Sequence, residues 1–168
     1  MAFPDPLETS GPSRPVWLPI AILTILVLLS ALPLPAGHGP LPDLVLVVLY
    51  IACARRPAAI SPGTVFILGL LQDLLSSTPF GLHALVFILV HAASSRAAEL
   101  HKSFLLYWLG FVPVAVVAMA VSWLVIAIHH ASFVSLDLIL PRTLASILAF
   151  PLIVIPYQWI AGVHHDET

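Results

Sequence analysis

The fold of this protein is decided by the stretch FLLYWLGFVPVAVVAMAVSWLVIAI, residues 104–128, which contains no charged side chain. As a helix rising about 1.5 Å per residue, this stretch is long enough to cross a hydrocarbon core of about 30 Å. Comparable apolar runs fill most of the remaining chain, at residues 16–34, 42–54, 58–75, 80–95 and 139–163. The sequence therefore predicts an all-α integral membrane protein, a single bundle of about six transmembrane helices.

The composition leaves little material for a water-facing surface. Of the 168 residues, 60% are hydrophobic and 8% are charged, and the mean hydropathy is +1.08. A soluble domain of this size has about a quarter of its residues charged. The net charge is -2 and the six Lys and Arg residues form no basic stripe, so we expect no nucleic-acid partner. The one cysteine, Cys53, cannot form an intramolecular disulfide and is expected to be buried.

Two tails flank the predicted membrane domain, which covers residues 16–163. Residues 1–15 are rich in proline and polar residues and are expected to form a flexible cytoplasmic tail, and residues 164–168 a short cytoplasmic tail. The first apolar run has a second interpretation, a signal peptide cleaved near Ala36. That run is longer than the apolar region of about 7–15 residues in a signal peptide, which favours a transmembrane helix.

The positive charges predict how the helices are oriented. With six crossings, one side of the membrane receives Arg14, Arg55, Arg56, Arg96 and Lys102, and the other receives Arg142. Because short cytoplasmic loops retain Lys and Arg, both termini are expected in the cytoplasm. The runs at 42–54 and 80–95 are short for a crossing, and we expect them to be kinked, tilted or sunk within the bundle.

Aromatic residues near the predicted helix ends, and prolines in the last helix, support two further predictions. Membrane-interface anchors are predicted at Trp17, Tyr107, Trp108, Tyr157 and Trp159. The last helix is expected to be kinked at its prolines, Pro141, Pro151 and Pro156. Such kinks free backbone carbonyls that need partners inside the bundle.

Two acidic side chains lie within the apolar runs, where an ionised group costs about 2.5–3.5 kcal/mol even on insertion scales. Asp43 follows Pro42 at the start of its run and is expected to cap the first-turn amides of a helix. Asp73 lies near the end of the third run, with Gly69 one turn earlier on the same face. A glycine there lets another helix approach closely and cover the carboxylate.

A short reversal, SSTPFG at residues 76–81, follows Asp73. A loop of this length makes the flanking helices antiparallel neighbours. His83 comes just after Gly81, so we expect its imidazole to meet the carboxylate of Asp73 in a pair that orients the hairpin. Proton transfer or ligand capture by this pair is the functional alternative.

A polar seam is expected along one face of the fourth helix, formed by His83, Phe87, His91 and Ser94. The seam either lines a substrate cavity or makes interhelical hydrogen bonds worth about 0.6 kcal/mol each, and the second interpretation is favoured. In the substrate-cavity alternative, Gln72 and Asp73 join the two histidines.

Neither a metal site nor a catalytic motif is expected. His129 and His130 are adjacent, and neighbouring helical residues diverge by about 100°, so the pair lacks the i, i+4 spacing with which two imidazoles bind one metal. The chain contains no GxSxG, HExxH, glycine-rich phosphate loop or CxxC motif. We therefore expect no cofactor and no enzymatic activity.

Arg142 opens the last helix, and its expected counter-charge is Asp137 or a partner protein. Small residues four apart suit close helix packing, at Ala118 and Ser122 and at Ala145 and Ala149. The candidates for structural or partner-binding roles are Asp43, Gly69, Gln72, Asp73, Gly81, His83 and Arg142.

The stretch GLLQDLLSSTPFGLHAL, residues 69–85, resembles the most recognisable motif of the rod shape-determining protein MreD family. Residues 42–57 are similar to the second span of the family, Ser103-Phe104 and Trp108 to the entry of its fifth span, and residues 142–152 to its last span. The likeness covers nearly the whole chain after the tail. Family members often have Gly between Ser and Thr in the hairpin, where this chain has Ser77.

This resemblance implies a non-enzymatic scaffold of the bacterial elongation machinery in the inner membrane. Its implied partners are a bitopic MreC protein and, through it, cytoplasmic MreB filaments and peptidoglycan synthases outside; membrane lipids surround it, and self-association stays open. The resemblance also implies a fold like that of the substrate-capture subunits of energy-coupling-factor vitamin transporters, an analogy that transfers shape and not activity. The alternative function is a small-molecule or vitamin capture subunit of a transporter.

Overall fold

The computed structural model describes residues 17–30, 32, 42–55, 60–96, 104–131, 137 and 139–160, with side chains in the last helix as far as Pro156. The predicted tails at 1–15 and 164–168 lie outside these residues, as do Ala36 and the positive charges Arg14, Arg56 and Lys102. The side chains of the predicted anchors Tyr157 and Trp159 are outside them too.

Six α-helices make up the described part of the chain, which contains no strand. Their bounds are α1 Trp17–Ser30, α2 Leu44–Arg55, α3 Pro62–Ser76, α4 Leu82–Arg96, α5 Phe104–His130 and α6 Ile139–Ile160. The all-α fold and its six helices are therefore confirmed.

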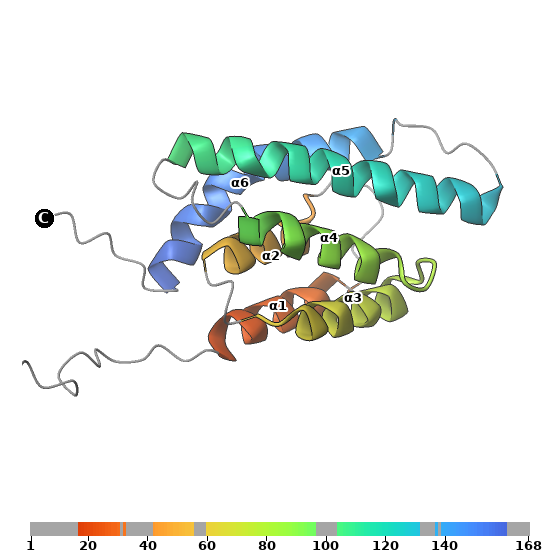
Figure 1. The fold of residues 1–168 in the computed structure, drawn as a ribbon, viewed down its shortest axis with the longest axis horizontal. Coiled ribbons are helices and arrows are strands. Elements are labelled where there is room, and N and C mark those ends of the chain that lie inside the picture. Colours follow the sequence, from red (N-terminus) through yellow and green to blue (C-terminus); the bar gives the residue numbers. More distant parts are fainter. Residues whose placement is uncertain are drawn as a thin grey trace, which may run out of the picture.

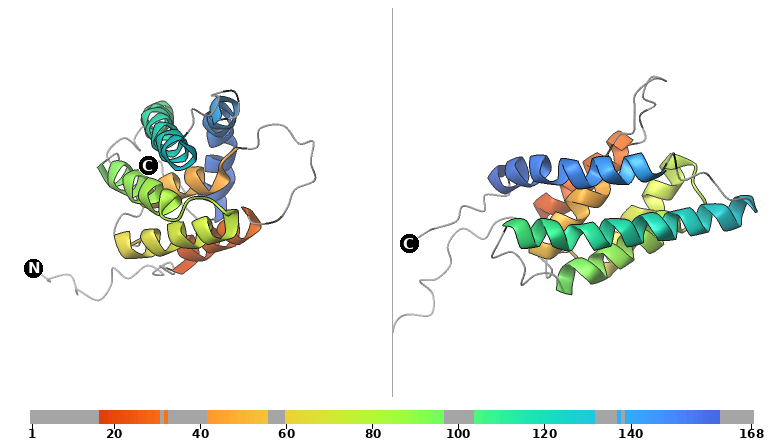
Figure 2. Two further views of the ribbon diagram at one scale, coloured as in Figure 1. Left: turned by 90° about the vertical axis from the view of Figure 1, so that its right-hand side faces the viewer. Right: turned by 90° about the horizontal axis from the view of Figure 1, so that it is seen from above.

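The helices form three layers of two, seen along their length in Figure 1 and from the end in the left view of Figure 2. One outer layer pairs α5 with α6, the middle layer pairs α4 with α2, and the other outer layer pairs α3 with α1. Within the stack, α4 packs between α3 and α5, and α2 packs between α1 and α6. The middle helices thus hold the bundle together.

Helix α2 lies at the centre of the bundle. Every residue from Val45 to Ala54 is buried, because this helix is apolar on all sides and has neighbours on three of them. The short second run is therefore sunk within the bundle, one of the expected outcomes. Helix α4, also in the middle layer, keeps an exposed edge at Leu85 and Leu89.

The helices differ in their capacity to cross a membrane. Among the described residues, α5 and residues 139–156 of α6 are long and apolar enough to do so. The other four are apolar but shorter, and the 12 residues of α2 span about 18 Å. Large apolar side chains point outward along α6 at Leu140, Leu144, Leu148 and Leu152. Such a face is suited to lipid.

The prolines of α6 differ in their effect. Pro141 lies in the first turn, where its missing N–H removes no helical hydrogen bond, so the predicted kink there is wrong. Pro151 and Pro156 lie inside the helix, and α6 turns away from α5 along its C-terminal half (Figure 1). The carbonyl of Ile147, four residues before Pro151, accepts a hydrogen bond from the indole Nε1–H of Trp108 at 3.0 Å. The predicted partner for a freed carbonyl is thus present.

An aromatic cluster joins α2, α5 and α6. The rings of Tyr50 and Tyr107 stack at 5.5 Å, and those of Phe111 and Phe150 at 4.7 Å. Tyr107 is 2% exposed, so its predicted role as an interface anchor is wrong. The ring belongs to the core because α2 and α6 cover that side of α5. Trp17 is 64% exposed, and its role as an anchor stays a prediction.

Candidate functional site

The carboxylate of Asp73 is the most heavily bonded side chain at one end of the bundle. We call this end the hairpin end; it contains the α3–α4 turn, residues 77–81. Oδ1 of Asp73 accepts hydrogen bonds from the backbone N–H of His83 at 2.8 Å and the hydroxyl of Thr78 at 3.1 Å. Oδ2 accepts from the backbone N–H of Gly81 at 2.9 Å. The Asp73 side chain is fully buried, so these bonds replace the water it has lost.

The expected carboxylate–imidazole pair is present, with 2.8 Å between His83 Nδ1 and Asp73 Oδ1. A carboxylate only accepts, so Nδ1 must carry the proton. In the neutral ring, Nε2 then has a free lone pair, and it has no hydrogen-bond partner among the described residues. The imidazole is held in one orientation by Asp73.

Asp73 also caps α4 from the preceding helix. The residue before α4 is Gly81, which has no side chain with which to cap the first turn, and its φ of +95° suits glycine. Asp73 instead binds the amides of Gly81 and His83 at the positive end of the helix dipole. The sequence reasoning placed Asp73 beside the imidazole but missed this capping role.

Gly69 allows α3 and α4 to meet closely enough for these bonds. A Cβ added at Gly69 would lie 2.4 Å from Ala84 Cα and 2.8 Å from the carbonyl carbon of His83. Both atoms belong to the backbone of α4 and cannot rotate away. The expected close approach at Gly69 is therefore present.

Helix α3 ends at Ser76, and its C-cap residue Ser77 adopts the left-handed conformation with φ 52° and ψ 31°. Glycine adopts such a conformation without the clash of a Cβ, whereas serine is strained there. Ser77 therefore occupies a position where glycine is the better residue.

Gln72 binds a second helix rather than the Asp73–His83 pair. Its Oε1 accepts from Ser30 Oγ of α1 at 3.0 Å, and its Nε2 donates to Ser76 Oγ at 3.0 Å. It is 6% exposed. Gln72 thus ties α1 to α3.

Asp43 caps α2, as predicted. Its Oδ1 accepts from the N–H of Leu46 at 3.2 Å, and its own backbone N–H donates to Ser146 Oγ of α6 at 2.7 Å. Its Oδ2 lies 3.5 Å from Arg142 Nη2, a long ion pair at the hairpin end. In the described part of the chain the counter-charge of Arg142 is therefore Asp43, and the expected pairing with Asp137 is wrong.

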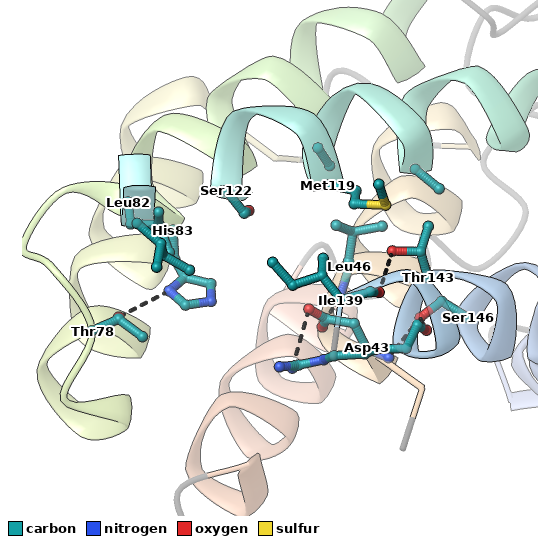
Figure 3. A pocket seen from close by; sticks show the side chains of 14 residues that line it. Asp43, Leu46, Thr78, Leu82, His83, Met119, Ser122, Ile139, Thr143 and Ser146 are labelled. Atoms are coloured by element: carbon teal, nitrogen blue, oxygen red, sulfur yellow. Dashed lines mark hydrogen bonds and ion pairs between the residues drawn. The ribbon is translucent and has the colours of Figure 1, made fainter. Parts of the chain in front are cut away.

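A cavity of about 370 Å³ lies at the hairpin end between α2, α4, α5 and α6 (Figure 3). Thr78 and His83 form one side, Ser122 and Met119 of α5 lie above, and Asp43 and Ser146 face His83 from across the cavity (Figure 3). Arg142 also lines it. The cavity unites three of the predicted site residues, Asp43, His83 and Arg142.

A second cavity, of about 560 Å³, lies on the other side of the start of α2. It is lined by residues of α1, α2 and α3, including Gln72, and by Asp43 and Arg142. The Asp43–Arg142 pair thus separates the two cavities.

The polar seam of α4 does not form one site. His83 bonds to Asp73, whereas His91 Nδ1 lies 3.3 Å from Cys53 Sγ of the buried α2. Ser94 Oγ donates to the backbone carbonyl of His91 at 3.1 Å. Of the four residues that the capture alternative needs, His83 lines the first cavity, Gln72 the second, and Asp73 and His91 neither.

Sequence reasoning did not assign the hydroxyl groups at the hairpin end to a cavity, and it identified Ser122 only as a small residue for helix packing. Thr78, Ser146 and Ser122 line the first cavity, and Ser146 joins α2 to Arg142 by donating to the carbonyl of Arg142 at 2.9 Å. Single hydroxyls in apolar helices give no periodic signal. Within the described residues, no three His, Cys, Asp or Glu side chains gather as metal ligands.

Comparison with known families matches residues 14–158 to the rod shape-determining protein MreD. No curated protein and no solved structure matches the chain. The family match includes the hairpin with Gly69, Asp73 and His83, and also Asp43 and Arg142. Because the match covers most of the chain, this protein belongs to the MreD family of membrane proteins, which determine rod shape.

Proposed function

We propose that this protein is a scaffold of the bacterial cell-elongation complex that binds an MreC-like bitopic protein. Through that partner it couples cytoplasmic MreB filaments to peptidoglycan synthesis outside. The membership of residues 14–158 in the MreD family carries this proposal. The carboxylates of Asp43 and Asp73 at the hairpin end both accept helix-capping hydrogen bonds, which supports a structural role for them.

In the proposed topology, six helices lie in the inner membrane and both termini are cytoplasmic. The described Arg55 and Arg96 end α2 and α4 at the end opposite the hairpin, whereas Arg142 lies at the hairpin end. The positive-inside rule then assigns the hairpin end to the outer surface. The short helices cross with flanking residues or with local thinning of the bilayer. A fold like that of the vitamin-capture subunits belongs to this proposal as an analogy of shape.

A groove between α4 and α5 is the surface that best fits the membrane helix of the partner. It has a volume of about 360 Å³ and is lined mostly by small or apolar residues, including Ala92, Ala93, Val114, Val117 and Ala118, together with Arg96 at the C-terminal end of α4. In lipid, helices associate through close packing at small side chains. The groove therefore offers a partner helix a closer approach than the leucine face of α6 does.

Co-purification from native membranes tests the partner and the surface together. Val117 is 52% exposed in the groove and Leu148 is 67% exposed on α6, so each accepts tryptophan without core disruption. We expect tagged wild type and Leu148→Trp to recover a bitopic MreC-like protein, identified by mass spectrometry, and Val117→Trp to lose it.

A clean deletion of the gene tests the function itself. We expect rod-shaped cells to become round, and Leu148→Trp to restore the rod. Unchanged cell shape after deletion would contradict the scaffold function. Equal recovery of the partner by both tryptophan variants would contradict only the groove.

A further inference from the structure

We propose that the cavity between α2, α4, α5 and α6 binds one phospholipid, with the headgroup phosphate at Arg142 and an acyl chain along α5. This inference goes beyond the scaffold function and does not depend on the identity of any protein partner. It rests on the distribution of charge along the cavity, on the unused donors of Arg142 and on the free nitrogen of His83.

The cavity is charged at one end and apolar at the other. Its charged and titratable residues, Asp43, His83 and Arg142, lie at the hairpin end. Deeper along the bundle the walls are apolar, formed by Leu46, Ala115, Ala118 and Met119. This order matches a phospholipid, which has a charged headgroup followed by hydrocarbon.

The length of the cavity suits an acyl chain. On α5 its lining runs from Ile126 near the hairpin end to Ala115 deep in the bundle. At about 1.5 Å per residue, this distance is about 16 Å. A volume of about 370 Å³ is also within the range of small-molecule sites, about 300–1,000 Å³. The cavity thus accommodates a headgroup and part of one chain.

The guanidinium of Arg142 has donors to spare. It has five N–H groups, and within the described residues it has one hydrogen-bond acceptor, Asp43 Oδ2 at 3.5 Å. That distance exceeds the usual length of a charge-assisted bond, about 2.7–2.9 Å. The side chain is 56% exposed. Arg142 therefore has the planar, bidentate donor set that recognises a phosphate.

Two acceptors face the same space. Nε2 of His83 carries no proton when the ring is neutral, and Asp43 Oδ2 is only weakly engaged by Arg142. These atoms suit the ammonium or hydroxyl groups of a phospholipid headgroup. A phosphate at Arg142 with such a group beside it would satisfy both signs of charge in the cavity.

Native mass spectrometry of the full-length protein tests the site. Delipidated protein in detergent is titrated with palmitoyl-oleoyl phosphatidylethanolamine, and one bound lipid is counted. We expect wild type to bind one, and Arg142→Gln to bind it about tenfold more weakly, because a charge-assisted hydrogen bond is lost. Arg96→Gln, which removes an exposed arginine at the opposite end, is the matched control and should bind like wild type.

Two further measurements distinguish binding of the headgroup from binding of the acyl chain. Met119→Trp fills the apolar part and leaves Arg142 in place, so we expect it to lose the lipid as well. Glycerophosphoethanolamine carries the headgroup without chains, and we expect it not to displace the bound lipid. Arg142→Lys preserves the charge and should retain intermediate binding, and a melting temperature for each variant confirms folding.

Three results would overturn the proposal. Equal lipid binding by wild type and Arg142→Gln would show that Arg142 does not bind the phosphate. Displacement by glycerophosphoethanolamine at similar concentration would assign the cavity to a soluble organophosphate. A photocrosslinker at position 126, which lines the cavity and leaves Arg142 in place, would assign the cavity to a protein if it captured a polypeptide and no lipid in native membranes.

Discussion

Two carboxylates at the hairpin end have opposite surroundings. The Asp73 side chain is fully buried, and its oxygens accept from Thr78, Gly81 and His83 at 2.8–3.1 Å. The Asp43 side chain is 25% exposed, caps α2 with one oxygen and meets Arg142 at 3.5 Å with the other. A saturated buried group serves the fold, whereas a loosely paired group beside a cavity is available to a ligand. The difference separates the structural site from the candidate binding site.

The largest expected effect separates the two carboxylates directly. Asp73→Ala leaves the amides of Gly81 and His83 without their acceptor in a buried place, and we expect it to lower the free energy of unfolding by about 3–5 kcal/mol. Asp43→Ala removes a cap and should cost about 1 kcal/mol. Thermal unfolding in detergent measures both. Equal losses would mean that burial does not distinguish them.

Gly69→Ala tests whether the tight contact of the hairpin is needed. The added Cβ meets the backbone of Ala84, so we expect a loss of about 1–3 kcal/mol or more. Gly63→Ala in the same helix is the control, because the nearest atom to its Cβ would be Ser61 Oγ at 3.8 Å. It should be neutral or slightly stabilising. If both variants have the same melting temperature, α3 and α4 move apart more easily than this geometry implies.

The surroundings of Asp43 depend on how α6 is attached to the bundle, because its counter-ion Arg142 lies on that helix. Trp108→Phe removes the donor to the Ile147 carbonyl, and we expect it to cost about 1–2 kcal/mol. Pro151→Ala restores an N–H at the position that normally binds this carbonyl. In the double variant the cost of Trp108→Phe should fall, which a double-mutant cycle in thermal unfolding measures. Strict additivity would contradict the pairing.

The sequence predicted the helices because apolar runs and proline-rich breaks are local features. It also predicted the Asp73–His83 contact, since a short reversal brings residues ten apart together. It did not predict that Tyr107 is buried or that Arg142 pairs with Asp43, 99 residues away in the chain. These contacts depend on which helices are neighbours, and uniform hydrophobicity carries no signal for that.

The cavity escaped sequence analysis because its lining residues come from several helices. In the capture alternative the polar seam followed one face of α4, whereas the cavity draws one to three polar residues from each of several helices. Arg142, Asp43 and His83 were each identified, but for separate reasons. Only the arrangement of the layers brings them together.

The smallest expected effect tests strain in the turn that positions Asp73 over α4. Ser77→Gly relieves a left-handed residue, and we expect it to raise the free energy of unfolding by about 0.5–1 kcal/mol, or about 2 °C in melting temperature. Ser76→Gly, one residue earlier and still helical, should have the opposite sign because it removes the hydroxyl that binds Gln72. A loss in both variants would place the constraint in the serine hydroxyl of Ser77 and not in its backbone. A higher free energy of unfolding for Ser77→Gly alone would mean that backbone strain at Ser77 lowers the stability of the hairpin, although the carboxylate of Asp73 is fully hydrogen-bonded.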